Sequence, residues 1–290
     1  MDIDFHRDSL NAVGHTKITE FLSSEELLFC TSLTGSLSKG CITRFKHDKR
    51  IKKSLQYKHP DQELWSYHSG DTFADIRIKE GTHYLNRMQH VFNNNHITNK
   101  AINLIHSLVG SDLKYFKDRY IEQHPGEEGL LPHQDMCASV HEKVFDSWYT
   151  IYIALTDTNE QSGSLFVEEH AKLKKENLGM CVTGCDSLRF TGVASSCACN
   201  GKRQGIALEN IYSYNHKHIA GKKHTMIPIP LKAGDCIIFD GWLLHGTPIN
   251  ESESVRKVLT FAYVKPKANV DVQALASTAT VRPGMLRVFE

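Results

Sequence analysis

The sequence lacks the features that mark membrane proteins and general nucleic-acid-binding proteins. Across its 290 residues no apolar run approaches the ~20 residues that a membrane-spanning helix requires. Neither sign of charge dominates, because 34 basic residues are balanced by 33 acidic residues and the formal net charge is +1. A general nucleic-acid-binding protein would need a net basic surface. We therefore expect no nucleic-acid partner and no membrane partner, and the oligomeric state stays open.

The two ends of the sequence show no targeting signal. The N-terminus, Met-Asp-Ile-Asp-Phe-His-Arg, is acidic and mixed instead of basic and then apolar, which argues against a secretory signal. The C-terminus, Leu-Arg-Val-Phe-Glu, matches neither a peroxisomal nor a retention signal. These features predict a cytoplasmic protein in which the eight cysteines are reduced thiols.

Four of these cysteines form a cluster with Cys-x3-Cys and Cys-x-Cys spacing. A zinc knot or a redox pair is the alternative to free thiols on a loop. The spacing fits no standard paired-cysteine zinc signature, so we expect free thiols. The cluster consists of Cys181, Cys185, Cys197 and Cys199.

Three residues have the order and separation of a metal site. His133 and Asp135 form a His-x-Asp pair in Leu-Pro-His-Gln-Asp, and His245 lies in Leu-Leu-His-Gly-Thr. This is the pattern of a 2-His-1-carboxylate facial triad, which binds Fe(II) on one face and leaves the opposite positions open. On an extended strand, side chains two residues apart point the same way, so His133 and Asp135 could hold one ion while Gln134 points away.

A downstream arginine favours this metal site over a surface pair. In a chain with 17 histidines an isolated His-x-Asp pair is more often a surface feature than a ligand pair. Arg256, however, lies eleven residues beyond His245 and opens the strand-like run Lys-Val-Leu-Thr-Phe-Ala-Tyr-Val. Its planar guanidinium could hold a carboxylate bidentately. A metal triad with a carboxylate clamp is the minimum equipment of a 2-oxoglutarate-dependent oxygenase.

The N-terminal part, residues 1–112, is predicted to be a mainly helical support region. Ser23 and Glu26 form a capping box that opens an amphipathic helix, and a short strand is expected just before it, at 14–18. Two further helices are expected, at 81–93 and 99–108.

From about residue 113 the pattern changes to short strands separated by turns. Many short strands without intervening helices indicate a sandwich or jelly roll. We expect one domain over 1–290, with this core at 113–265 and a C-terminal extension at 266–290. The expected strands span 115–123, 147–156, 164–168, 225–230, 235–239 and 255–264.

Two polar segments lie outside this pattern. Residues 170–224, rich in Gly, Ser, Cys, Lys and His, lie between the segments that carry the metal-binding residues. An insertion of this length in a compact barrel is either a functional lid or disordered, and its position favours a lid. The basic run at 46–58 is expected to be a solvated face, with contact to an anionic substrate group as the alternative.

Four blocks of the sequence carry a family resemblance. They are residues 11–23, 132–135, 152–172 and a closing block at 232–256, which contains Lys-Ala-Gly-Asp and His-Gly-Thr and is the most specific. Over roughly residues 12–265 the sequence resembles the phytanoyl-CoA dioxygenase-like family of Fe(II)/2-oxoglutarate-dependent oxygenases. The resemblance implies a mainly β fold with flanking helices, built on a double-stranded β-helix of the jelly-roll, cupin-like type.

The resemblance also implies a catalytic metal centre and a cosubstrate clamp. It places Fe(II) at His133, Asp135 and His245, and it places Arg256 on the distal carboxylate of 2-oxoglutarate, with O₂ as the oxidant. Asp135 disfavours chlorination, because halogenating relatives lack this carboxylate.

Three further residues fall at cosubstrate-contact positions of the family. Thr247 falls where a Ser or Thr commonly assists the arginine, although it could simply be a β-former. Tyr152 falls at a position that contacts the cosubstrate, with a core aromatic as the alternative. Gln123 falls where some members place a lysine on the cosubstrate, so this charge is missing here.

The expected function follows from the resemblance. It is an Fe(II)- and 2-oxoglutarate-dependent hydroxylase of a small polar metabolite or natural-product intermediate in secondary metabolism, with release of succinate and CO₂. Desaturation, epoxidation and ring formation use the same iron site and stay open. A fatty acyl-CoA hydroxylase of the same family, a cupin-like metal protein that does not use 2-oxoglutarate, and a non-catalytic binding protein on the same scaffold are the alternatives.

Overall fold

The computed structural model describes part of the chain. Most of the expected lid at 170–224, the four clustered cysteines, most of the basic run at 46–58 and the end of the C-terminal extension lie outside the described residues. Within the described part, no helix is both long and apolar enough to cross a membrane. The described residues are 1–47, 52–53, 62–69, 72–79, 82–89, 91–92, 95–127, 129–130, 132–137, 144–169, 173, 175, 216–219 and 222–272.

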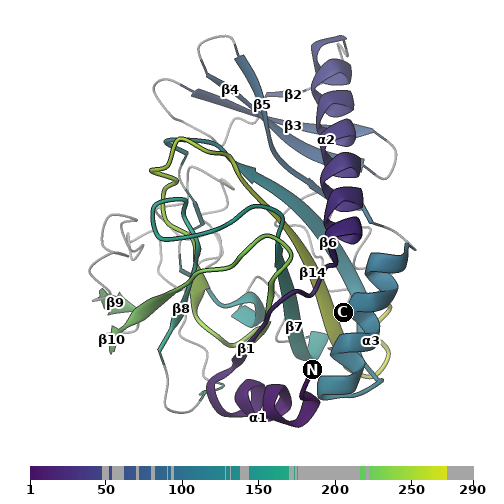
Figure 1. Ribbon diagram of the computed structural model, residues 1–290, viewed down its shortest axis with the longest axis vertical. Coiled ribbons are helices and arrows are strands. Elements are labelled where there is room, and N and C mark those ends of the chain that lie inside the picture. Colours follow the sequence, from purple (N-terminus) through teal and green to yellow (C-terminus); the bar gives the residue numbers. More distant parts are fainter. Residues whose placement is uncertain are drawn as a thin grey trace.

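A nine-stranded antiparallel sheet forms the frame of the molecule (Figure 1). Its strand order is β1-β12-β7-β14-β6-β5-β4-β3-β2. The order is non-sequential because the longest strands, β6, β7 and β14, pair with each other over large sequence separations. The strands are β1 His15–Ile18, β2 Lys52–Lys53, β3 Gln62–Ser69, β4 Thr72–Lys79, β5 Thr82–Gln89, β6 Lys114–Gln123, β7 Phe145–Ala154, β12 Cys236–Asp240 and β14 Arg256–Pro266.

A three-stranded sheet, in the order β11-β8-β13, packs against one face of the large sheet. Leu165 and Val167 of β8 share an apolar cluster with Tyr152 and Ala154 of β7, so a core lies between the two sheets. This arrangement is the mainly β, jelly-roll fold that the sequence predicts. The remaining strands are β8 Leu165–Glu168, β11 Met226–Ile229, β13 His245–Gly246 and a separate pair, β9 His216–Ile219 with β10 Lys222–His224.

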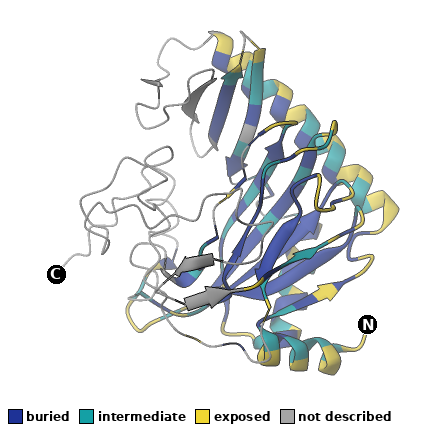
Figure 2. Ribbon diagram, turned by 90° about the vertical axis from the view of Figure 1, so that its left-hand side faces the viewer, coloured by how far each residue is buried: buried dark blue, intermediate teal, exposed yellow. Residues whose placement is uncertain are grey.

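Three helices pack on the large sheet. They are α1 Ile3–Val13, α2 Ser24–His47 and α3 His96–Val109. Leu10 of α1 and Leu104 of α3 join a second core cluster, and α2 contacts β4 and β5. Figure 2 shows that most of the described strands are buried, whereas exposed residues lie mainly on the helices and in loops.

Strand β7 shows how the large sheet separates the two cores. Ile151 and Ile153 belong to the helix-side cluster, whereas Tyr152 and Ala154 belong to the cluster between the sheets. This alternation follows from the two-residue period of a strand. Side chains on the Tyr152 face therefore point into the space between the sheets, and that space holds the candidate site.

The helix expected at 81–93 is wrong, because residues 82–89 form strand β5. Leu85 and Met88 are both buried and three residues apart, a spacing that is typical of a helix face. In β5 a bulge produces the same spacing, because Asp75 pairs with Arg87 while the next residue of β4 pairs with Leu85. The extra residue in β5 turns Leu85 and Met88 to the same side. Since β3, β4 and β5 are strands, the region before residue 112 is less helical than predicted.

The other expected elements are confirmed. The capping box is present, because Ser23 N donates to Glu26 Oε2 at 2.8 Å and Glu26 N donates to Ser23 Oγ at 3.2 Å. The strand expected at 14–18 is β1, and the helix expected at 99–108 is α3, which begins earlier because Asn95 caps it. The six strands expected after residue 113 correspond to β6, β7, β8, β11, β12 and β14.

Helix α1 was not predicted. Its N-cap is Asp2, whose side chain accepts a hydrogen bond from Phe5 N, and it ends at Gly14, which has a positive φ of 82°. Both signals, Asp2 and Gly14, stand in the sequence.

Candidate metal centre and cosubstrate pocket

The backbones of His133 and His245 bring the two side chains together. His133 N donates to His245 O at 2.8 Å, and His245 N donates to His133 O at 3.0 Å, which forms an isolated antiparallel bridge. Two glycines permit this close approach. A Cβ on Gly129 would lie 2.0 Å from Thr247 O, and a Cβ on Gly246 would lie 2.9 Å from a backbone oxygen of the facing segment. The register of the two histidines is therefore fixed by main-chain contacts.

Asp135 joins the histidines through a turn. It is the first residue of a 3-10 helix, Asp135–Cys137, so the extended strand expected across His133 and Asp135 is wrong. The turn is anchored because Met136 N donates to Gly241 O at 3.0 Å. Gln134 points away, as expected, and its Nε2 donates to Trp242 O at 2.6 Å.

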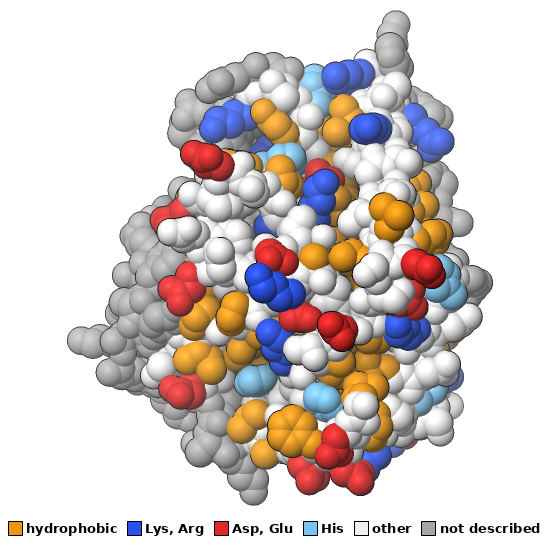
Figure 3. Space-filling model, viewed as in Figure 1, with side chains coloured by type: hydrophobic (Ala, Val, Ile, Leu, Met, Phe, Trp, Pro, Cys, Tyr) orange, Lys and Arg blue, Asp and Glu red, His pale blue; other side chains and the backbone are white. Residues whose placement is uncertain are grey.

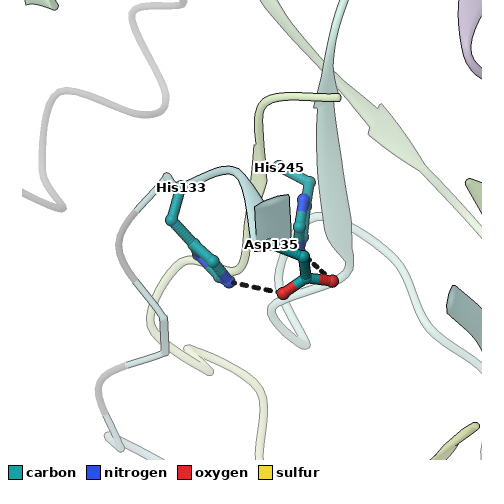
Figure 4. A group of neighbouring side chains, drawn as sticks. All are labelled: His133, Asp135 and His245. Carbon is teal, nitrogen blue, oxygen red and sulfur yellow. Dashed lines mark ion pairs between the residues drawn. The ribbon is translucent and has the colours of Figure 1, made fainter. Parts of the chain in front are cut away.

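The three side chains nevertheless converge, as Figure 4 shows. Asp135 Oδ1 lies 3.8 Å from His133 Nε2, and Asp135 Oδ2 lies 3.9 Å from His245 Nε2. One ligand atom from each residue lies within 4.8 Å of the other two, so all three could bind the same ion. Two imidazoles and one carboxylate are the donor set of a facial Fe(II) site.

Neighbouring groups orient two of these ligands. His245 Nδ1 lies 2.9 Å from Leu243 O, so a proton on Nδ1 is donated to that oxygen and Nε2 keeps its lone pair for a metal. Thr150 Oγ1 donates to Asp135 Oδ2 at 2.9 Å and itself accepts from Trp148 Nε1 at 2.9 Å. This chain of hydrogen bonds fixes the carboxylate.

The Asp135 carboxyl is held in its ionised form. Burial opposes ionisation, but electrostatic interactions with His245, His133 and Lys117, together with the Thr150 hydrogen bond, outweigh it and lower the pKa of Asp135 to about 2. A charged carboxylate is the form that binds a metal.

All seven residues that the sequence predicts to bind the metal or the cosubstrate line one cavity. It extends between the two sheets, from the three converging side chains to the first residue of β14. The predicted residues that line it are His133, Asp135, His245, Arg256, Thr247, Tyr152 and Gln123.

Arg256 is buried in this cavity with an unused donor. The side chain is 4 % exposed, and its Nη1 donates to the Tyr152 hydroxyl. Its Nε has no hydrogen-bond partner among the described residues. A buried donor without a partner costs about 1–3 kcal/mol, which a bound carboxylate would offset. The arginine therefore fits the distal carboxylate of 2-oxoglutarate.

Tyr152 and Thr247 each keep a hydroxyl hydrogen that could reach the same carboxylate. Burial raises the pKa of Tyr152, so its phenol stays protonated while it accepts from Arg256. Thr247 Oγ1 accepts a hydrogen bond from Leu130 N at 2.8 Å.

Gln123 has a different position from the other candidates. It pairs with Arg256 across β6 and β14, but its Nε2 already donates to Glu127 O and Pro248 O, both at 2.8 Å. The amide nitrogen thus links the segments of Glu127 and Pro248 through hydrogen bonds. Only the amide oxygen, Oε1, lacks a partner among the described residues.

Several cavity residues were missed in the sequence. Thr150 and Trp148 lie in a strand-like run of the sequence. Their hydrogen-bond chain to Asp135 joins segments that are distant in the sequence, so no pattern of neighbouring residues indicates it. Lys117 and Arg119 carried a usable signal, because they lie six and four residues before Gln123 on the same strand and therefore share its face.

Comparison with known proteins decides the family. A profile of the phytanoyl-CoA dioxygenase (PhyH) family matches residues 49–258, which is more than half of the chain. The chain belongs to the PhyH family. Members of this family use Fe(II), 2-oxoglutarate and O₂, in agreement with the expected cofactors and with the His-Asp-His group. A search of curated proteins found no match.

Solved structures share the PhyH fold at low sequence identity. AviO1 from Streptomyces viridochromogenes Tue57 is 14% identical with a TM-score of 0.55, over 93% of this chain and 97% of that one. SnoN, a non-heme alpha-ketoglutarate-dependent epimerase from nogalamycin biosynthesis, is 14% identical with a TM-score of 0.52, over 90% and 82%. EvdMO1 is 15% identical with a TM-score of 0.52 over 91% of this chain, which spans about half of the EvdMO1 chain.

Proposed function

We propose that this PhyH protein is an Fe(II)- and 2-oxoglutarate-dependent oxygenase that hydroxylates a small polar metabolite or natural-product intermediate. The observation that carries the proposal is the convergence of His133, Asp135 and His245 to within 4.8 Å in the cavity that also contains the buried Arg256. In this proposal the three residues hold Fe(II) and leave the opposite coordination positions open for 2-oxoglutarate and O₂.

The other residues position the cosubstrate. The Arg256 guanidinium holds the distal carboxylate, supported by hydrogen bonds from Tyr152 and Thr247. Bound iron with 2-oxoglutarate and O₂ supplies the oxidising power, and the cosubstrate is released as succinate and CO₂. The part of the chain is to fix the facial geometry, to hold the cosubstrate and to orient the substrate carbon.

Hydroxylation is the proposed outcome. A carboxylate at Asp135 occupies the position that a halide would need, which disfavours halogenation. The structural neighbour SnoN is described as an epimerase, so this fold accommodates other outcomes of the same iron site. Mass-spectrometric identification of the product distinguishes them, since hydroxylation adds one oxygen atom and epimerisation changes no mass.

We further propose that the protein acts in the cytoplasm on a small molecule. Cys30, Cys41 and Cys236 are buried free thiols, which suits a reducing compartment. Basic and acidic side chains both occur on the face shown in Figure 3, which supports a small-molecule substrate over a polyanionic partner.

The metal site is tested by equilibrium dialysis of Fe(II) under anaerobic conditions. The unaltered protein is expected to bind about one Fe(II) per chain, and His133→Ala, Asp135→Ala and His245→Ala are each expected to lose this binding while keeping the fold. The control is His96→Ala, an exposed histidine at the start of α3. Near-normal binding by the Asp135 variant would contradict the assignment.

A further inference from the structure

Two cations of β6 line the cavity on the side away from the cosubstrate clamp. Lys117 and Arg119 alternate with buried core residues along the strand, so both side chains point into the space between the sheets. Neither residue has a part in holding the metal or 2-oxoglutarate in the function proposed above.

No carboxylate of the described residues forms an ion pair with either cation. Arg119 Nε is buried and makes no hydrogen bond within this part of the chain. The Lys117 ammonium lies 4.9 Å from the ring centre of Phe116 and 5.0 Å from that of Trp148. The rings hold the amine in place. Burial and the neighbouring Arg119 charge lower the pKa of Lys117 well below its usual value, so a bound anion would stabilise the charged form of this side chain.

Two other arginines of the cavity wall have carboxylate partners. Arg77 Nη2 lies 2.9 Å from Glu127 Oε1, and Arg87 Nε donates to Asp75 Oδ2. The cavity therefore contains two neutralised pairs beside three cations, Lys117, Arg119 and Arg256, that lack a carboxylate partner among the described residues.

The expected cofactors leave an excess of positive charge at the two β6 cations. Fe(II) and the 2-oxoglutarate dianion cancel, Asp135 balances Arg256, and Glu122, which also lines the cavity, balances only one of the two β6 cations. One carboxylate of 2-oxoglutarate is expected at the metal and the other at Arg256, so the cosubstrate has no third anionic group to offer.

The strand register places the two cations far from the cosubstrate clamp. Arg256 pairs with Gln123, whereas Arg119 and Lys117 lie four and six residues earlier on β6. At about 3.3 Å per residue these positions are about 13 Å and about 20 Å away along the strand. A carboxylate held by Arg256 cannot also be held by Lys117.

Lys117 lies instead at the level of the metal-binding residues. It pairs with Ala262 of β14, which pairs in turn with Thr150 of β7, the hydrogen-bond donor to Asp135. Strands are about 4.8 Å apart, so the Lys117 and Thr150 backbones lie about 10 Å from each other across the sheet. A small molecule between them would contact the β6 cations and approach the metal at the same time.

We propose that the substrate carries an anionic group, either a carboxylate or a tetrahedral phosphoryl or sulfuryl group, which Lys117 and Arg119 hold. This proposal rests on the proposed function, because it names the substrate class of the same site. The guanidinium of Arg119 can bind an oxyanion through two hydrogen bonds, and Lys117 adds a point charge beside it. Desolvation of both cations in the cavity selects against a neutral molecule, which would leave their charges buried and uncompensated.

Isothermal titration calorimetry under anaerobic conditions tests the proposal with two simple anions. Sulfate represents the tetrahedral groups and acetate represents carboxylates, and each is titrated into protein loaded with Fe(II) and 2-oxoglutarate at constant ionic strength in chloride. At least one of the two anions is expected to bind. Lys117→Gln and Arg119→Gln are each expected to raise its dissociation constant about tenfold or more, as is typical for loss of a charged hydrogen bond.

Matched variants separate the site from a general charge effect. Lys114→Gln removes an exposed lysine from the same strand and is expected to leave anion affinity unchanged. Lys117→Arg and Arg119→Lys keep both charges, so each gives a measurement even where a glutamine variant fails to fold. Lys117→Arg is expected to retain most of the affinity, and Arg119→Lys only part of it, because an ammonium lacks the bidentate fork. The anion that binds with the higher affinity indicates whether the anionic group of the substrate is tetrahedral or a carboxylate.

Two results would overturn the anionic-substrate proposal alone. One is that neither anion binds although Fe(II) and 2-oxoglutarate do, and the other is that the glutamine variants bind as tightly as the unaltered protein. Failure to bind Fe(II) and 2-oxoglutarate in the first step is a different result, because it rejects the oxygenase function itself.

Discussion

Two sides of the cavity, the metal-binding residues and the β6 cations, differ in how their polar groups are satisfied. At the metal end, His245 Nδ1 lies against a backbone carbonyl, and Asp135 accepts from Thr150. On the β6 side, Arg119 Nε has no partner and Lys117 no ion pair among the described residues. The metal-binding side chains are oriented by the chain itself, whereas the β6 cations lack a carboxylate partner among the described residues.

This difference agrees with the ligand proposed for each group, a metal ion for the three converging side chains and an anionic group for the β6 cations. A metal ion needs ligands held in one geometry, so the chain itself supplies the supporting hydrogen bonds. An anionic group brings its own acceptors, and buried donors kept for it give selectivity against molecules that lack the group. Arg256 resembles Arg119, because its buried Nε also has no hydrogen-bond partner among the described residues.

The largest effect is expected from breaking the metal end. Asp135→Ala removes the carboxylate ligand, and succinate formation from 2-oxoglutarate is expected to fall by several orders of magnitude without loss of the fold. Coupled assays of succinate, with circular dichroism as the check on folding, measure the two effects. Near-normal turnover in this variant would mean that the iron is held elsewhere.

The next largest effect is expected at the cosubstrate clamp. Arg256→Ala removes one partner of a desolvated charge pair, which typically costs about 2–5 kcal/mol, or roughly 30-fold to several thousand-fold in affinity. Calorimetric titration of 2-oxoglutarate into Fe(II)-loaded protein measures the loss, while Fe(II) binding is expected to stay near normal. Arg256→Lys is expected to restore only part of the affinity, because an ammonium lacks the bidentate fork. An unchanged 2-oxoglutarate affinity in the alanine variant would assign the clamp to another cation.

A smaller effect is expected from weakening the support of the metal end. Thr150→Val keeps the shape of the side chain but removes the hydrogen bond to Asp135 Oδ2. Loss of such a supporting contact commonly lowers metal affinity about 10- to 100-fold. The control is Thr260→Val, which lies in the same cavity wall but makes no contact with the three ligands in the described structure. Equal Fe(II) affinities for the two variants would show that Thr150 does not position Asp135.

The smallest effect is expected far from both ends. Ser23→Ala removes the N-cap hydrogen bond of α2, and the free energy of unfolding in urea is expected to fall by about 1 kcal/mol. Fe(II) and 2-oxoglutarate affinities are expected to stay unchanged, because α2 packs on β4 and β5 and none of its residues is among those that line the cavity. A matching loss of Fe(II) affinity would indicate that the helix and the metal end are coupled.

Local signals in the sequence predicted much of this structure. The capping box at Ser23 and Glu26 and the β-branched and aromatic runs act over a few residues, so they can be recognised without knowledge of the fold. The order and spacing of His133, Asp135, His245 and Arg256 also stand in the sequence, because the two pieces of the metal site are short and continuous.

Contacts between distant segments could not be predicted in the same way. The bulge in β5 depends on pairing with β4, and without it Leu85 and Met88 have helical spacing. The convergence of His133 with Asp135 depends on a turn that is anchored at Gly241. The sequence predicts that the two side chains point the same way, because they are two residues apart on an expected strand. They do converge, but a 3-10 turn and not a strand brings them together. The support of Asp135 by Thr150 likewise depends on how β7 packs under the metal end.

The central claim is that His133, Asp135 and His245 hold one Fe(II) and that Arg256 holds the distal carboxylate of 2-oxoglutarate. The most direct test is a crystal structure obtained anaerobically with Fe(II) and 2-oxoglutarate, with anomalous data collected at the iron edge. We predict a single iron peak coordinated by the three side chains, with the far carboxylate of 2-oxoglutarate bound by the Arg256 guanidinium. An iron peak outside this group, or a 2-oxoglutarate carboxylate bound away from Arg256, would contradict the claim.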